Sequence, residues 1–141
     1  MIIIQALLKI LHTMTQEHAE KVLAFIESQC KAKVEKAIKE TLGVKVNLAF
    51  NIFTMYNGDH IITALDTLDD VDAKMRNNAI LKQLFDSVIL RMDIWANDPG
   101  EEMGVFFNIG VSYQHGYHGG QNGHDLMGYS ITESGEERII K

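Results

Sequence analysis

The chain has almost none of the two residue types that cross-link or interrupt a fold. Its 141 residues include one cysteine, Cys30, and one proline, Pro99. A single cysteine excludes an internal disulfide, and no CxxC pair is present. We therefore expect Cys30, which falls in a helical pattern, to be a small buried hydrophobic residue. The low proline content argues against a long disordered linker.

The common short motifs of catalytic sites are also missing. The sequence has no glycine-rich phosphate loop with its lysine, no GxSxG elbow and no HExxH pair. An acidic group between Asp66 and Asp72 lacks the central glycine and terminal glutamate of a calcium loop, so it indicates the start of a helix. These absences favour a protein that is not an enzyme.

No hydrophobic run is long enough to cross a membrane. The apolar start at residues 1–4 is interrupted by Gln5 and Lys9, whereas a span needs about 20 apolar residues. A secretory signal would carry its positive charge before the apolar region and end in small residues. Here Lys9 lies inside the apolar segment, and no such cleavage site follows. We expect a cytoplasmic protein that does not bind a membrane, located in the host cytoplasm if a virus encodes it.

What is present describes an ordinary globular chain. Apolar side chains make up 46% of it and charged side chains 23%, close to the average of soluble domains. The 13 basic and 19 acidic residues give a net charge of −6, which argues against nucleic-acid binding. We expect one domain over residues 1–141, with an apolar N-terminal segment at 1–14 and a polar tail at 133–141.

Residues 15–42 have the pattern of a long amphipathic helix. Apolar side chains recur there every three or four positions, acids precede bases by four positions, and Gly43 can end the helix in the left-handed conformation. We expect His18 in this helix to face water. Residues 2–12 fit a further short helix, and a strand is an alternative there.

Beyond Gly43 the period changes to two. Residues 44–53 alternate as a strand, and Asn57-Gly58 favours a two-residue hairpin turn before a returning strand at residues 60–65. Asp66 or Thr67 can cap a second long helix, whose apolar stripe extends to Trp95 and which residues 97–100 end. Residues 105–114 and 126–132 predict two more strands.

The predicted order is therefore helix, strand, strand, helix, strand, strand (αββαββ). We expect an α+β fold, a two-layer sandwich in which two long helices cover one face of a four-stranded antiparallel sheet. A short N-terminal helix would add to it.

The far face of that sheet is a candidate binding surface because it has almost no charge. Neutral amides beside aromatic residues resemble the centre of an interface, and a glycine allows close approach of a partner. Coverage by the N-terminal segment or the C-terminal tail is the alternative. The candidate partner-binding residues are Asn47, Asn51, Phe53, Phe106, Asn108, Gly110, Ser112 and Gln114, with Tyr117 from the following loop.

A histidine- and glycine-rich segment at residues 114–125 is the second candidate. A zinc-like divalent metal could be held there by His115, His118, His124 and Asp125. The spacing matches no named zinc motif, and all ligands would come from one flexible loop. A solvated loop, or a loop that contacts a partner through Tyr117, is the simpler interpretation.

Taken together, these features favour a non-enzymatic protein-binding or assembly module without a cofactor. It would be of the accessory or inhibitor type that phages and mobile elements encode. Self-association through the neutral sheet face is favoured over a foreign protein partner, because closed homo-oligomers are common. The alternative is a small metal- or ligand-binding enzyme that uses the loop at residues 115–125.

Overall fold

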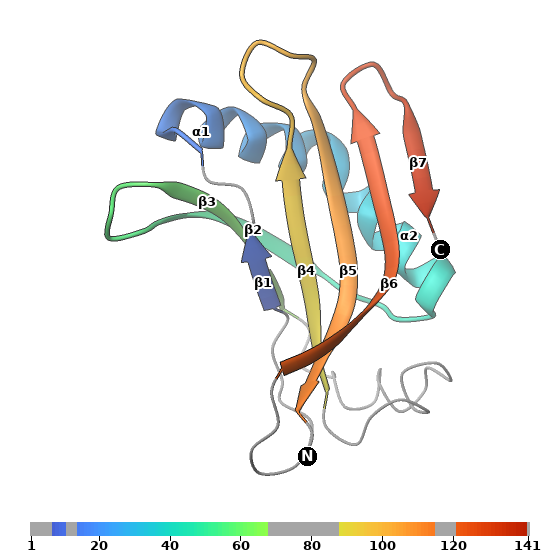
Figure 1. Cartoon of the computed structure of the whole chain (residues 1–141). Helices are drawn as coiled ribbons and strands as arrows, with labels where there is room; N and C mark the ends of the chain where they lie inside the picture. Colours follow the sequence, from blue (N-terminus) through green and yellow to red (C-terminus); the bar gives the residue numbers. More distant parts are fainter. Residues whose placement is uncertain (1–6, 11–13, 68–87, 115–120, 141) are drawn as a thin grey trace.

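A computed structural model describes residues 7–10, 14–67, 88–114 and 121–140 (Figure 1). Its helical part consists of α1 (Gln16–Phe25), a π-helical turn η1 (Ile26–Cys30) and α2 (Lys31–Leu42). The strands are β1 (Leu7–Ile10), β2 (Leu48–Thr54), β3 (His60–Asp66), β4 (Val88–Ala96), β5 (Gly104–Gln114), β6 (Gln121–Thr132) and β7 (Glu137–Ile140).

The predicted first helix is confirmed. Helical structure continues from Gln16 to Leu42 through the π-helical turn, in which Lys31 N–H donates to Ile26 O. The Thr15 side chain accepts a hydrogen bond from His18 N and caps the start. Gly43 has φ 71° and ends the helix in the left-handed conformation.

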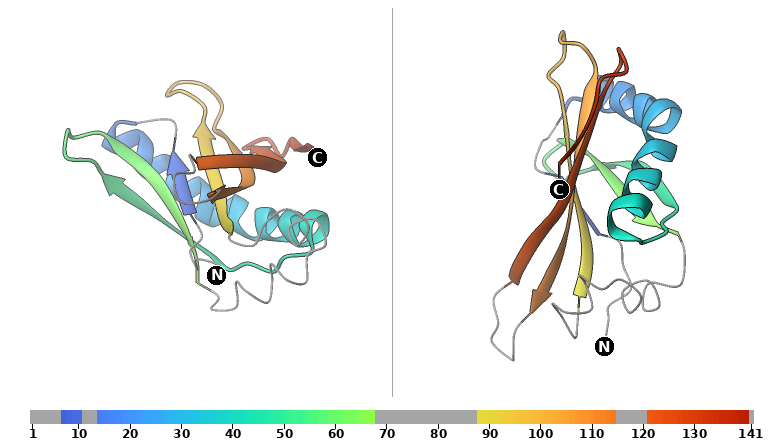
Figure 2. Two further views of the ribbon diagram at one scale, coloured as in Figure 1. Left: turned by 60° about the horizontal axis from the view of Figure 1, so that its bottom comes forward. Right: turned by 90° about the vertical axis from the view of Figure 1, so that its right-hand side faces the viewer.

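The helix packs against one face of a five-stranded sheet with the order β1-β4-β5-β6-β7 (Figure 2). Phe107 is fully buried in the core between these layers, and its ring centroid lies 6.1 Å from that of Phe50 and 6.3 Å from that of Tyr129. Cys30 is also fully buried, as predicted. The expected α+β class is therefore confirmed.

The prediction of a second long helix is wrong for residues 88–96, the part of it that the structure describes. Val88–Ala96 is strand β4, which pairs antiparallel with β5 from Val88 opposite Tyr113 to Ala96 opposite Val105. The residues Met92, Ile94 and Ala96 alternate on the buried side, and this period of two competes with the helical spacing in the same segment. Residues 68–87 of the predicted helix lie outside the described residues.

The segment expected to end that helix is a hairpin turn between β4 and β5. Glu101 N–H donates to Asp98 O at 3.2 Å, and Gly100 has φ 94°. Gly100 therefore allows the chain to turn from β4 into β5, and it does not end a helix.

Both ends of the chain contribute strands. Leu7–Ile10 is β1, which runs parallel to β4. The predicted N-terminal helix is therefore wrong for these residues, and the alternative prediction of a strand is confirmed. The predicted polar tail includes β7, which follows a turn at Gly135 with φ 92° and pairs with β6. The Tyr129 hydroxyl donates to Glu137 at 2.7 Å and helps to hold this strand against the sheet.

The four predicted strands do not form one sheet. β2 and β3 make a separate two-stranded antiparallel sheet, a hairpin that projects beyond β1 (Figure 1). It is joined to the rest by a bridge between His60 and Met14 and by packing against α1 and β1. A sheet of two strands is marginal alone, so this packing is needed for its stability.

The turn of the hairpin differs in detail from the prediction. Gly58 N–H donates to Met55 O at 2.9 Å and Gly58 has φ 93°. No described residue other than glycine has a positive φ, so Asn57 does not adopt the conformation that the two-residue turn requires. The loop is the longer type, with a glycine bulge as its last residue.

Candidate functional site

The structure divides the predicted partner-binding residues between two surfaces. Asn51 and Phe53 are on β2, and Asn47 directly precedes that strand. The residues on β5 are Phe106, Asn108, Gly110, Ser112 and Gln114. Of the loop candidates, Tyr117, His115 and His118 lie outside the described residues, whereas His124 and Asp125 belong to β6.

The first surface, which we call the hairpin face, is the exposed side of β2 and β3. It consists of three cross-strand pairs, Ala49 with Leu65, Asn51 with Thr63 and Phe53 with Ile61. None of these side chains is charged. Phe53 is 56% exposed and Leu65 50%.

The other side of the same hairpin is buried. Leu48, Phe50, Ile62 and Ala64 lie there, each with no more than 6% of its surface exposed. Tyr56 in the turn is fully exposed. The hairpin therefore carries Phe53, Tyr56 and Leu65, three of the five large hydrophobic side chains exposed among the described residues.

Asn47 is not part of the hairpin face. Its Oδ1 accepts a hydrogen bond from Lys31 Nζ at 3.0 Å, and its Nδ2 donates to Thr67 Oγ1 at 2.6 Å. Its backbone N–H donates to Asp66 Oδ1 at 3.0 Å. This amide connects α2 to the bases of β2 and β3 and has a structural role.

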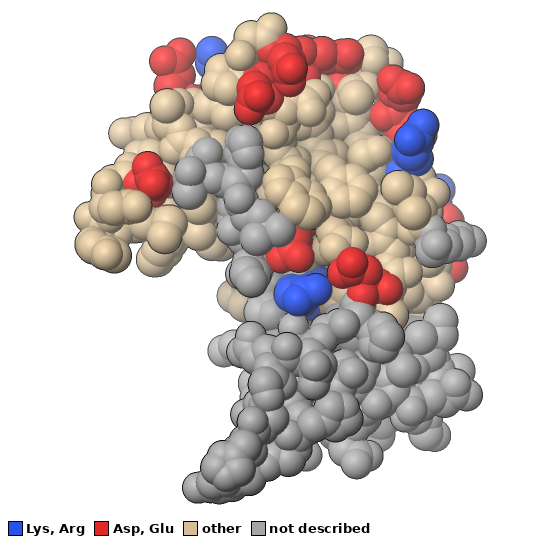
Figure 3. All heavy atoms as spheres, viewed as in Figure 1, with Lys and Arg blue, Asp and Glu red and all other residues tan. Residues whose placement is uncertain are grey.

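The second surface, the sheet face, is the side of β4, β5 and β6 that is turned away from the helix. A bulge shifts the register between Ile109 and Gly110, so that Asp125 lies opposite Gly110. Asp125 Oδ1 accepts from Asn108 Nδ2 at 2.9 Å and lies 3.3 Å from an Arg91 guanidinium nitrogen. The sheet face is thus charged, as the basic side chain between acidic ones in Figure 3 shows.

Aromatic residues occupy the neighbouring part of the sheet face. The Phe106 ring stacks on Trp95 with centroids 5.6 Å apart. A Cβ at Gly128 would lie 2.9 Å from the Phe106 ring, so this glycine makes room for the ring. Both aromatic side chains are half-buried, and they pack mainly against their own sheet.

The predicted metal ligands do not come together in the described part of the chain. Asp125 is engaged by Asn108 and Arg91 on the sheet face. His124 lies opposite Val111 in the β5–β6 ladder. Among the described residues, no group of three or more His, Cys, Asp or Glu side chains is placed to hold a metal ion.

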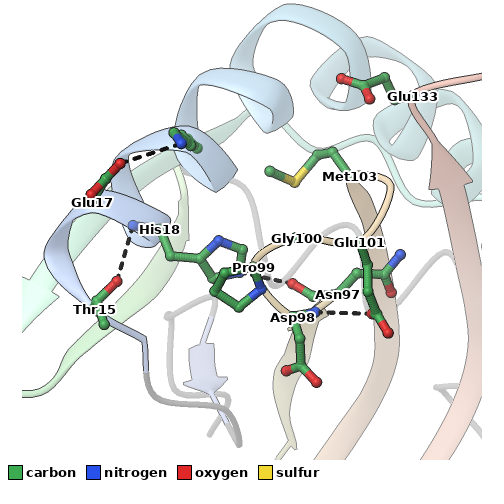
Figure 4. Close-up of a pocket in the computed structure, with 11 residues that line it drawn as sticks. Thr15, Glu17, His18, Asn97, Asp98, Pro99, Gly100, Glu101, Met103 and Glu133 are labelled. Carbon is green, nitrogen blue, oxygen red and sulfur yellow. Dashed lines mark hydrogen bonds and ion pairs between the residues drawn. The ribbon is translucent and has the colours of Figure 1, made fainter.

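A hollow of about 350 Å³ between the start of α1 and the β4–β5 turn was not predicted (Figure 4). His18 is only 6% exposed there, and its Nε2 lies 2.8 Å from Asn97 O. Because a carbonyl oxygen only accepts, Nε2 carries the proton. The expectation that His18 faces water is wrong, since its spacing to Val22 and Phe25 places it on the buried side of the helix.

The titratable groups in the core are also structural. Burial raises the pKa of the Cys30 thiol to about 12, so it is not a ready nucleophile. Burial and a hydrogen bond to Glu137 raise the pKa of Tyr129 above its usual value of 10.0. Neither group is set up for acid–base chemistry near neutral pH.

No family model, no curated protein and no solved structure matches this chain. Among the helices that the structure describes, none has the length and apolar character needed to cross a membrane.

Proposed function

We propose that this protein is a protein-binding module that assembles with a second copy of itself through the hairpin face. The observation that supports this best is the grouping of exposed Phe53, Leu65 and Tyr56 on one hairpin whose exposed face carries no charge. Aromatic residues are enriched and charged residues depleted at the centres of protein interfaces. The sheet face fits this role less well, because Arg91 and Asp125 lie across it.

A second copy is favoured over a foreign partner because closed homo-oligomers are common, and the charge of the molecule limits where that copy can bind. Two chains of net charge −6 repel each other over most of their surfaces. An uncharged face is where two copies can approach with the least electrostatic penalty. The hairpin in Figure 3 is an arm with little charge beside acidic regions, which fits this argument.

Light scattering of purified variants tests the proposal. We expect the natural protein to have the mass of a dimer at tens of micromolar, and Phe53→Arg to be monomeric because it places a charge in the contact. Ile139→Arg is the matched control, since Ile139 is also exposed (45%) but lies on β7. A natural protein that stays monomeric, or dissociation by Ile139→Arg but not by Phe53→Arg, would refute the proposal.

A further inference from the structure

Strand β2 has one edge that faces away from β3. Thr67 N–H donates to Asn47 O at 2.8 Å, and Met55 N–H donates to Asp59 O at 2.7 Å. These two bonds bracket the β2–β3 ladder, so the odd-numbered residues of β2 make the backbone hydrogen bonds to β3. The even-numbered residues therefore direct their N–H and C=O groups to the opposite side.

The first of these even-numbered residues agrees with this alternation. Leu48 N–H donates to Glu35 Oε2 at 2.7 Å, not to β3. Phe50, Ile52 and Thr54 follow along the same edge. Within the described residues, β3 is the only strand that pairs with β2, so in this part of the chain the backbone donors and acceptors of these three residues face no other strand.

This edge lacks the features that protect the two outer strands of the five-stranded sheet, β1 and β7. Edge strands are usually kept from pairing with other chains by shortness, charged residues or proline. β7 has four residues and includes Glu137 and Arg138, and β1 also has four. β2 has seven residues, and no charged residue or proline occurs between Lys45 and Asp59.

From this contrast we infer that β2 pairs edge to edge with β2 of a second copy, antiparallel, about a two-fold axis at Ile52. The inference rests on the proposed self-association and specifies its geometry. The two hairpins then form one continuous four-stranded sheet, and the hairpin faces of both copies lie side by side. This is strand addition, in which backbone hydrogen bonds supply much of the affinity.

The sequence of β2 suits this register. An axis at Ile52 pairs Phe50 with the partner's Thr54 through the backbone groups of this edge and leaves the bond between Leu48 and Glu35 intact. It also sets Asn51 opposite the partner's Phe53 on the hairpin face. Each phenylalanine thus meets a smaller polar side chain, and no charge meets a like charge.

Disulfide cross-linking between single-cysteine positions tests the register. Asn51 and the partner's Phe53 would form a pair without direct backbone hydrogen bonds, whose Cα atoms lie about 4.5 Å apart and suit a disulfide. We expect a mixture of the Asn51→Cys and Phe53→Cys proteins to form a mixed dimer on mild oxidation. Cys30 does not interfere because it is fully buried.

The control uses the neighbouring strand. Thr63 lies beside Asn51 on the same face but on β3, about 10 Å from the partner's Phe53, which is two strand spacings and too far for a disulfide. A mixture of Thr63→Cys and Phe53→Cys should therefore not cross-link. The same difference in distance applies to charge substitutions, because Asn51 lies next to the partner strand and Thr63 does not. Asn51→Lys should therefore raise the dissociation constant of the dimer at least tenfold, whereas Thr63→Lys should change it less than about threefold.

The outcomes separate this inference from the proposed function. A natural dimer in which the Asn51 and Phe53 cysteines cross-link and Thr63→Lys is tolerated supports both. A natural dimer without that cross-link, weakened equally by Asn51→Lys and Thr63→Lys, overturns edge pairing but leaves self-association through the hairpin face. A natural protein that is monomeric at tens of micromolar overturns both.

Discussion

At the scale of the residue, Tyr129 shows how the fold accommodates a buried polar group. Its ring packs near Phe107, and its hydroxyl donates to Glu137 Oε1 at 2.7 Å. Lys33 Nζ lies 3.6 Å from the same carboxylate oxygen. Burial first, and the hydrogen bond to Glu137 second, raise the pKa of Tyr129, because the phenolate would be buried beside a carboxylate.

The sign of this shift predicts a loss of stability in alkali. A tyrosine in the unfolded chain ionises near pH 10, while Tyr129 in the folded chain stays protonated. The contribution of protonated Tyr129 to the free energy of unfolding is complete below pH 10. It decreases as the pH rises toward the pKa of Tyr129 in the folded chain. In urea unfolding, we expect the free energy of unfolding to fall less steeply above pH 10 in Tyr129→Phe than in the natural protein.

Tyr56→Phe is the control for this measurement, because Tyr56 is fully exposed. Its alkaline decrease should match that of the natural protein. The same slope in Tyr129→Phe and the natural protein would contradict the interpretation.

His18 shows which residue-scale features a sequence can indicate. Its distance from Val22 and Phe25 was a usable signal for burial, but a helical histidine beside Glu17 is also typical of a solvated face. Its partner, Asn97 O, lies 79 positions further along the chain. Only the folded arrangement of α1 and the β4–β5 turn brings the two together.

At the scale of the element, Glu35 joins the long helix to the hairpin. Its Oε2 accepts from Leu48 N at 2.7 Å and from Lys31 Nζ at 2.6 Å. The Glu35 side chain is only 20% exposed, so a change there is less screened by solvent than at the surface.

We expect Glu35→Gln to lower the free energy of unfolding by about 1–2 kcal/mol, because Lys31 loses its charge partner and the bond to Leu48 is weakened. Glu40→Gln is the matched control, since Glu40 pairs with Lys36 in an exposed position of the same helix. It should change stability by less than about 0.5 kcal/mol. Equal effects in urea unfolding would show that Glu35 does not stabilise the helix–hairpin contact.

The elements also differ in how well the sequence predicts them. The helix ending at Leu42 could be predicted because its spacing and the stop at Gly43 are local signals. β4 could not be separated from a helix, since Val88 and Met92 fit both periods and its assignment depends on pairing with β5. β7 was missed because its four residues are all exposed and so give no alternation of burial.

At the scale of the whole molecule, sequence patterns could not predict that the strands divide into two sheets. Alternation predicts which side chains share a face of a strand, and it correctly placed Asn51 and Phe53 together. It does not say which strands are neighbours, so these residues were grouped with Phe106 and Asn108 of another sheet. The charge on the sheet face could not be predicted for a similar reason, because the helical spacing that extends to Trp95 places Arg91 in a helix.

The net charge of −6 gives a last prediction about the assembled molecule. Raising the ionic strength from about 0.01 M to about 0.15 M shortens the Debye length from about 30 Å to about 8 Å. This weakens the repulsion between two acidic copies and leaves an uncharged contact unaffected, so the dissociation constant should fall roughly two- to tenfold. Sedimentation equilibrium at the two salt concentrations measures the change. A dimer that weakens with salt would instead be held by ion pairs, which the hairpin face does not contain.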